Sequence, residues 1–447
     1  MNDLWQRLKK AQKPIWLYGM GDGADKILDR LHDRGVEVSG VFASDGFVRN
    51  QQFRGFTVTS FADAKARSGD MIVLVCFGSS REDVLDNIRR IASEQELYAP
   101  DVPVIGSGTF DSAYAASHGN ELRSVYNMLA DEQSRLVFRE CVAYRLDGNI
   151  SHLFACESDP NEAWSGILQP SDEERLVDLG AFNGDTVTEF LAHTNGRYEH
   201  IYAVEPGKKS FARLQTRLGG MDRVDLFNLA AAERTGEIVF NTHGGRNHAA
   251  VSASGRDRMS HTRTGNFAQQ SHALSGGELS THTPTANSSD QLSHTPTVNG
   301  SGRILLVPTD SNVQPPHTHA PNDRKLSPRT HAPNDRKLSP HTHAPSGREQ
   351  MSHARIERLP CDSVDNLLGG AAATIIKLDV EGCEAAAIEG ARRTIERFRP
   401  KIQAACYHRV EDYFALPLQV TAIRNDYRLY MRRFRGVPAW DVNFYFI

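Results

Sequence analysis

The sequence predicts an α/β protein with two sheets of mainly parallel strands, the second of which is interrupted by a long insert. Three observations lead to this prediction. Short apolar runs alternate with helical patterns in two separate parts of the 447 residues, which is the pattern of a parallel sheet. Several of these runs end in a glycine turn or an acidic residue. Between the last alternating units, residues 254–352 carry no sustained apolar period.

The composition excludes several classes of protein. The formal net charge is -4, which does not favour a nucleic-acid or anionic membrane partner. The six cysteines are scattered without a CxxC pair, so we expect reduced thiols and no metal site. The N-terminus lacks an apolar signal region, and no run approaches the ~20 apolar residues that span a bilayer. We therefore expect a cytoplasmic protein.

Residues 1–106 are expected to form the smaller α/β domain. Its first strand, Ile15–Tyr18, runs into the glycine turn Gly19–Ala24 and a helical pattern, and a second strand at Val36–Phe42 ends near Asp45. A third apolar run follows at residues 71–77. The turn and the acid approximate a dinucleotide-binding fingerprint. Two interpretations stay open: nucleotide or sugar-nucleotide binding, or a retained fold that shapes substrate access or an oligomer contact.

The remaining chain is divided into a helical linker at 107–170 and a larger domain at 171–447. Apolar runs in the larger domain predict about seven strands that end in a hairpin, together with a short extra one: Arg175–Leu179, Ile201–Val204, Val224–Ala230, Glu237–Phe240, Thr374–Val380, Lys401–Tyr407, Tyr427–Phe434 and Val442–Ile447. Intervening apolar residues at spacings of three and four predict helices between the strands.

The insert at 254–352 is expected to be a disordered loop within the larger domain. It is rich in Ser, Thr, Asn, Pro, Gly and His, and THAPNDRKLSP at 318–328 recurs at 330–340. The repeats are shorter than solenoid units and carry almost no apolar residues. Nine of the 18 histidines lie here, but an expanded repeat explains them better than a metal site does.

Three acidic or glycine-containing turns in the larger domain describe a nucleoside site. Asp178 ends the first strand, and Gly180 and Gly184 open the next helix, where backbone can approach a ligand closely. Glu205 ends the second strand, 25 residues after Gly180, where an acid can accept hydrogen bonds from ribose hydroxyls. The loop from Asp379 through Glu381 follows a central strand, at the edge where ligands bind in such sheets.

These segments resemble a known family. VDLGAFNGDT, YAVEP, IKLDVEG, GARRTIERFRPKI and the YHR-ED segment at 407–412 are similar to the FkbM family of S-adenosylmethionine-dependent methyltransferases. The resemblance covers about 120–250 and 354–447. It implies a class I methyltransferase fold, with a Rossmann-like seven-stranded sheet preceded here by a smaller Rossmann-like α/β domain. The insert after Asn247 departs from the family, whose members usually have a short loop there.

The resemblance also implies roles for individual residues. The methionine moiety of S-adenosylmethionine would be held by Asp178, Gly180, Asn183 and Gly184, the ribose by Glu205, and the adenine would lie near Asn228 and Ala230. Asp379 would lie by the transferred methyl group.

Three side chains are candidates for a general base: Asp379, Glu381 and His408. Structural alternatives remain open. Asp178 could brace backbone only, His408 could be a satisfied structural histidine, and Glu384 is better interpreted as an acid at a helix N-terminus.

The predicted function is therefore methylation of a hydroxyl on a small-molecule or glycan acceptor, with S-adenosylmethionine as the cofactor. Two alternatives belong to other classes: an NAD-dependent oxidoreductase or sugar-nucleotide-binding protein that uses the N-terminal fingerprint, and a catalytically inactive binding protein with a methyltransferase fold. The sequence leaves open whether the chain forms homo-oligomers.

Overall fold

The computed structural model describes residues 3–242, 248–251 and 355–447. These residues belong to one compact unit. The predicted disordered insert at 254–352 lies outside the described residues. Among the described residues, no helix combines the length and apolar character that crossing a bilayer requires.

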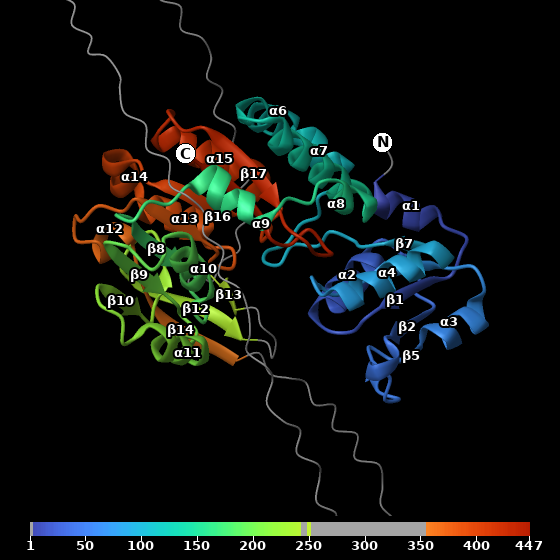
Figure 1. The fold of residues 1–447 in the computed structure, drawn as a ribbon. Coiled ribbons are helices and arrows are strands. Elements are labelled where there is room, and N and C mark those ends of the chain that lie inside the picture. Colours follow the sequence, from blue (N-terminus) through green and yellow to red (C-terminus); the bar gives the residue numbers. More distant parts are fainter. Residues whose placement is uncertain (1–2, 243–247, 252–354) are drawn as a thin grey trace, which may run out of the picture. The chain divides into compact units, whose positions relative to one another are not determined.

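The N-terminal part of the chain forms a parallel five-stranded sheet in the order β5-β2-β1-β6-β7 (Figure 1). The sequence predicted three of its strands; β5 and β7 are only two and three residues long and were missed. The elements are α1 (Leu4–Lys10), β1 (Ile15–Tyr18), α2 (Asp22–Asp33), β2 (Gly40–Ala43), η1 (Asp45–Phe47), β3 (Gln52–Phe53), β4 (Phe56–Thr57), β5 (Thr59–Ser60), α3 (Phe61–Ser68), β6 (Ile72–Val75), α4 (Glu82–Glu94) and β7 (Glu96–Tyr98).

Alternation along β1 explains why both faces of this sheet are covered. Ile15 and Leu17 pack with buried residues of α1 and α2, whereas Trp16 and Tyr18 pack with buried residues of α3 and α4. Successive side chains of a strand point to opposite faces, and all four are buried. A strand that is apolar at every position therefore becomes the centre of a three-layer unit.

The following segment is helical, as predicted, and packs against the C-terminal hairpin. It contains α5 (Ser112–Ser117), α6 (Gly119–Met128), α7 (Glu132–Asp147), α8 (Ser151–Ala155), α9 (Pro160–Glu162) and the π-helical segment η2 (Ala163–Leu168). Asp131 caps α7 by accepting a hydrogen bond from the Ser134 backbone N–H at 2.7 Å. The same carboxylate pairs with the buried Arg432 at 2.7 Å, which anchors the start of α7 to strand β17.

The C-terminal part forms a seven-stranded sheet in the order β10-β9-β8-β15-β16-β18-β17, in which β18 runs opposite to the other six strands. The prediction of a seven-stranded sheet that ends in a hairpin is confirmed. Its strands are β8 (Arg175–Leu179), β9 (His200–Val204), β10 (Val224–Phe227), β15 (Ile375–Leu378), β16 (Lys401–Ala405), β17 (Leu429–Arg433) and β18 (Val442–Phe446).

Helices cover both faces of this sheet as well. Apolar residues of α10 (Asp185–His193) and α11 (Lys208–Leu218) pack on one face. Residues of α13 (Glu384–Gly390), α14 (Arg392–Phe398) and α15 (Asp412–Ile423) pack on the other. The apolar spacing of Ile388, Ala391 and Ile395 is that of one continuous helix, but the chain breaks into two helices at Ala391.

A separate four-stranded sheet, in the order β11-β14-β12-β13, contains the point where the insert enters and leaves. Its strands are β11 (Ala230–Ala231), β12 (Gly236–Thr242), β13 (His248–Val251) and β14 (Arg355–Asp362). The predicted strand Val224–Ala230 is thus divided: β10 ends at Phe227, and the chain continues into this second sheet.

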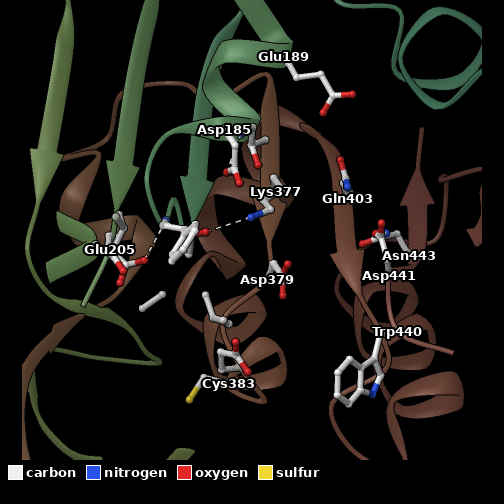
Figure 2. Close-up of a pocket in the computed structure, with 18 of the residues that line it drawn as sticks. Asp185, Glu189, Glu205, Lys377, Asp379, Cys383, Gln403, Trp440, Asp441 and Asn443 are labelled. Atoms are coloured by element: carbon white, nitrogen blue, oxygen red, sulfur yellow. Dashed lines mark hydrogen bonds between the residues drawn. The ribbon is translucent and has the colours of Figure 1, made fainter. Parts of the chain in front are cut away.

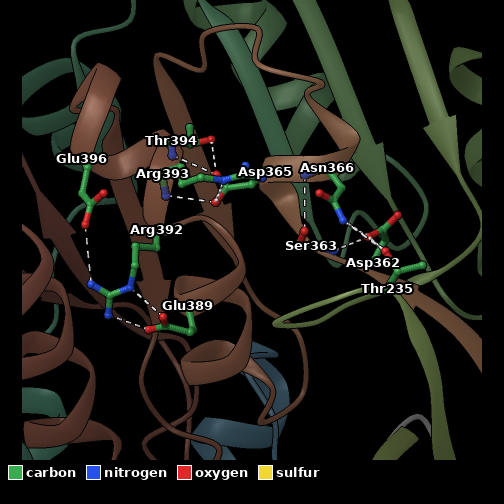
Figure 3. A network of polar contacts seen from close by, with 10 residues as sticks. All are labelled: Thr235, Asp362, Ser363, Asp365, Asn366, Glu389, Arg392, Arg393, Thr394 and Glu396. Carbon is green, nitrogen blue, oxygen red and sulfur yellow. Dashed lines mark hydrogen bonds and ion pairs between the residues drawn. The ribbon is translucent and has the colours of Figure 1, made fainter.

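Carboxylates tie the small sheet to the helices beside it (Figure 3). Asp362 at the end of β14 accepts a 2.7 Å hydrogen bond from the Thr235 hydroxyl. Asp365, in α12 (Val364–Leu367), accepts the backbone N–H groups of Arg393 and Thr394 at 3.0 and 2.8 Å. A carboxylate there satisfies N–H groups that the start of α14 leaves free.

The register of the small sheet predicts that the insert is dispensable. Val251 and Arg358 both lie opposite Val239, on the two sides of β12, so residues 251 and 355 are about 14 Å apart from strand spacings. An eight-residue Gly/Ser linker replacing 252–354 spans about 26 Å when extended. Shortening the loop should stabilise the fold by roughly 2 kcal/mol through loop-closure entropy, measured by urea denaturation. Loss of cooperative unfolding in the shortened chain would contradict the prediction.

Candidate active site

The loop after β8 is shaped by two glycines with positive φ. Gly180 has φ +80°, and a Cβ there would lie 1.9 Å from the Asp379 carbonyl oxygen. Gly184 has φ +83° and faces Leu214 and Leu218 of α11. Only glycine permits both the backbone conformation and the close approach, so the sequence DLGAFNGD brings the ends of β8 and β15 into contact.

Glu205, at the end of β9, closes this loop from the other side. Its two carboxylate oxygens accept hydrogen bonds from the backbone N–H groups of Phe182 at 2.9 Å and Gly207 at 2.7 Å. Burial raises the pKa of Glu205, and these two hydrogen bonds oppose the rise. The carboxylate is thus fixed at the sheet edge, and each oxygen retains a lone pair for a ligand hydroxyl.

Asp178 and Lys377 form a buried pair beneath the loop. Asp178 is fully buried, and its Oδ1 lies 3.4 Å from the Lys377 ammonium. Burial raises the pKa of Asp178, although Lys377 opposes the rise. Burial alone would lower the pKa of Lys377, but the negative charge of Asp178, and to a smaller extent that of Asp379, raises the pKa above its ordinary value. Lys377 also donates to the Gly180 carbonyl at 3.1 Å, so the pair supports the loop from below.

The loop after β15 is held by a buried carboxylate. Glu384, at the start of α13, accepts hydrogen bonds from the backbone N–H groups of Val380 at 2.9 Å and Gly382 at 3.3 Å. Between them, Glu381 adopts φ +52°, which is uncommon for a residue with a side chain. The folded-back loop places Glu381 at the cavity wall. Residues held in such uncommon backbone conformations often lie at functional sites.

His408 is fully buried behind that loop, among three carboxylates. Its Nδ1 lies 2.9 Å from Glu384, and its Nε2 lies 3.5 Å from Asp379 and 3.7 Å from Glu381. Burial alone would lower the pKa of His408, but these acids, Glu384 first, raise it to about 10. The imidazole is therefore a buried cation at neutral pH, shielded from the cavity.

Glu381 and Asp379 lie two residues apart in the loop after β15. Burial raises the pKa of Glu381 to about 7, with His408 opposing the rise and Asp379 adding to it. Asp379 accepts a hydrogen bond from the Tyr407 hydroxyl at 3.2 Å. Both side chains are about one-third exposed. A pKa of about 7 suits Glu381 to proton transfer near neutral pH.

A cavity of about 660 Å³ lies across the carboxyl ends of the central strands. Of the residues predicted from the sequence, it is lined by Gly180, Glu205, Ala230, Asp379 and Glu381. In Figure 2, Asp379 lies between Glu205 on one side and Trp440, Asp441 and Asn443 on the other. Two separate parts of the chain, before and after the insert, therefore build one cavity.

The other predicted site residues lie outside the cavity lining. Asp178 and His408 are buried below it. Asn183 accepts a hydrogen bond from Arg217 at 3.0 Å, and Asn228 donates to the backbone carbonyls of Glu205 and Pro206. Gly184 packs against α11. Their positions are those of residues that support the loops rather than touch a ligand.

Sequence reasoning missed part of the cavity lining. It includes Trp164, Phe182, Asp185, Thr186, Glu189, Lys377, Gln403, Trp440, Asp441 and Asn443. Position in the predicted elements could have identified two of these groups: Asp185 and Thr186 begin the helix after the glycine turn, and Gln403 lies on the strand beside β15. Nothing in the sequence pattern singles out the loop with Trp440 and Asp441.

Comparison with known proteins agrees with this architecture. Residues 178–433 match the model of the methyltransferase FkbM domain. The chain belongs to the FkbM methyltransferase family. The family domain thus begins at Asp178 and spans both sides of the insert.

A solved structure shares the fold of the chain. The crystal structure of methyltransferase FkbM from Methylobacillus flagellatus KT superposes with a TM-score of 0.59, at 16% sequence identity, and covers 97% of this chain and 90% of that one. No curated protein sequence matches the chain.

As an FkbM methyltransferase, the protein uses S-adenosylmethionine and transfers its methyl group to an acceptor. The cavity fits this cofactor chemically. The buried carboxylate of Glu205 suits ribose hydroxyls, and the start of α10 offers backbone N–H groups for a carboxylate. Asp185, in the first turn of α10, suits an ammonium group.

The buried cluster around His408 predicts a pH-dependent contribution to stability. Because the folded pKa of about 10 lies above the ordinary 6.5, the contribution is complete below pH 6.5 and is lost as pH rises through 10. His408→Gln should cost roughly 3–5 kcal/mol of unfolding free energy near pH 6.5, because it leaves buried carboxylates without their cation. The cost should shrink toward pH 10, measured by urea denaturation across pH.

His152→Gln is the matched control. His152 also contacts two carboxylates, Glu140 and Asp147, but its side chain is 25% exposed, so its loss should cost less than about 1 kcal/mol. An equal loss in the two variants, or a loss for His408→Gln that is independent of pH, would contradict the assignment of a buried imidazolium.

Proposed function

We propose that the enzyme methylates a hydroxyl oxygen on a glycan or a small secondary metabolite. The observation that carries this proposal is that Glu381, with a pKa raised to about 7, lines the same cavity as the ribose-type acid Glu205. An amine or thiolate acceptor has less need of such a base, whereas a hydroxyl is a weak nucleophile until its proton is removed.

The acceptor side of the cavity has the character of a carbohydrate site. Trp440 is 39% exposed, and an indole face packs well against the C–H face of a sugar ring. Gln403, Asp441 and Asn443 line the same side and provide donors and acceptors for hydroxyl groups. Burial raises the pKa of Asp441, and a hydrogen bond from Asn443 opposes the rise. This combination favours a polyhydroxylated acceptor over a wholly apolar one.

Catalysis needs alignment and removal of one proton. The bound cofactor supplies a methyl group on a sulfonium, which is already a good leaving group. The protein holds the acceptor oxygen in line with the methyl carbon. Glu381 would accept the hydroxyl proton as the acceptor oxygen takes up the methyl group. Asp379 is placed beside it, and the buried His408 cation holds both carboxylates in position.

Glu205 is expected to contribute directly to cofactor binding. Glu205→Gln should weaken binding of S-adenosylhomocysteine by roughly 10- to 100-fold, because a hydrogen bond to a charged acceptor contributes about 1.5–3 kcal/mol. Isothermal titration calorimetry measures the change. Glu199→Gln is the control, since Glu199 pairs with Arg175 at the surface, outside the cavity lining. Equal affinity of the Glu205 variant and the wild type would contradict the assignment.

Glu381 is expected to act as the general base that removes the proton of the acceptor hydroxyl. With an accepting glycoside or polyol found in a panel that also contains amines and thiols, kcat/KM of the wild type should rise with pH through about 7, because ionised Glu381 is the active form. Glu381→Gln should lower kcat roughly 10²- to 10⁴-fold and abolish this rise. Release of S-adenosylhomocysteine measures the rate.

Glu189→Gln is the control for this variant, because Glu189 lines the cavity from α10, away from the edge loop. It should keep the pH profile of the wild type. Methylation of only the amine or thiol members of the panel would refute the hydroxyl acceptor.

A further inference from the structure

A second cavity lies in the N-terminal domain, at the carboxyl edge of its parallel sheet. It measures about 550 Å³ and is lined by residues that follow β1, β2 and β6, together with α4. The chain leaves β1 for β2 on one side and returns to β6 on the other. Ligands of open parallel sheets bind where the strand order reverses in this way, and the volume suits a small molecule.

Aromatic rings form the walls of this cavity. Tyr18 and Phe42 stack with ring centroids 4.8 Å apart, and Phe77 meets Tyr18 edge-on at 4.9 Å. Phe61 lies under the Arg90 guanidinium, 5.2 Å from its ring centroid. At the rim, Phe47 is 64% exposed. A large aromatic ring left in solvent beside an aromatic-walled cavity offers a flat base a surface on which to stack.

Hydrogen-bonding groups surround the aromatic walls. The Tyr18 hydroxyl is held by Ser44 at 2.6 Å and Asn87 at 2.8 Å, so it is fixed at the cavity wall. Asp45 lines the cavity directly after β2. Its carboxylate makes no hydrogen bond or ion pair with any residue that the structure describes. An acid in this position is suited to ribose hydroxyls.

The turn after β1 leaves backbone groups for an anion. Gly19 and Gly21 have φ of +108° and +125°. A Cβ on Gly21 would meet nothing within 4 Å, so the turn is open on that side. Gly23 packs against the Cys76 carbonyl, where a Cβ would approach to 2.4 Å. Within the described part of the chain, the N–H groups of Met20 and Gly21 donate no hydrogen bond, which suits a diphosphate.

From these observations we infer that the N-terminal domain binds a nucleoside diphosphate, with the base against the aromatic walls, the ribose at Asp45 and the diphosphate at the turn after β1. This site is separate from the cofactor cavity and does not depend on which acceptor the enzyme methylates. A dinucleotide and a sugar nucleotide share this chemistry.

Calorimetry on the full chain tests the inference. ADP, UDP and GDP are titrated in the presence of saturating S-adenosylhomocysteine, which blocks the cofactor cavity. At least one should bind, and Asp45→Ala and Phe47→Ala should each weaken that binding by roughly tenfold or more. Both side chains are exposed, so neither change should impair folding. Glu37→Ala, an exposed acid before β2, should bind as the wild type does.

Further titrations with NAD and with UDP-, GDP- and ADP-sugars show whether the natural ligand is a dinucleotide or a sugar nucleotide. Binding of either class more tightly than the free nucleoside diphosphate supports the site. Absence of binding by every nucleotide at millimolar concentration would overturn the inference. Binding that S-adenosylhomocysteine abolishes, or that neither the Asp45 nor the Phe47 variant changes, would place the nucleotide elsewhere and overturn it equally.

Discussion

The active site depends on one close contact, between the turn after β8 and the end of β15. At Gly180 there is no room for a side chain, because the Asp379 carbonyl occupies the place of a Cβ. Because of this contact, Glu205 and the loop with Asp379 and Glu381 line the same cavity. Any residue larger than glycine must separate the two strands, and since interiors are densely packed, the separation would be transmitted to the sheet.

The acidic groups around this contact are balanced by two buried cations, Lys377 and His408. Lys377 lies under the β8 turn beside Asp178, and His408 lies under the β15 loop among Asp379, Glu381 and Glu384. His408 is shielded from the cavity, whereas Lys377 forms part of the cavity lining, and the carboxylates that these cations hold face or support the cavity. The cations reduce the repulsion among several neighbouring carboxylates, which would otherwise destabilise these loops. The pKa of Glu381 remains at about 7 in this arrangement.

The strands and the glycine turns were predictable from the sequence because both leave a local pattern: apolar runs bounded by Gly180 or by Glu205. The break at Ala391 was not, because the apolar spacing continues across it. For the site, position at a strand end predicted Glu205, Asp379 and Glu381 on the cavity. Burial of His408 was not predictable, because it depends on α13 and α15 packing over the strand end. Trp440 reaches the cavity from a hairpin loop, which carries no periodic signal.

The pairing of β8 with β15 has a consequence for synthesis on the ribosome. Leu176 in β8 lies opposite Ile375 in β15. The central strand β8 is therefore synthesised about 200 residues before the strand with which it pairs. At typical elongation rates of 5–20 residues per second, that interval is about 10–40 s. During this time the nascent β8 edge exposes unpaired backbone groups to other chains. Shortening the insert would roughly halve the delay, so the insert is expected to lower the yield of folded protein as well as the stability of the finished fold.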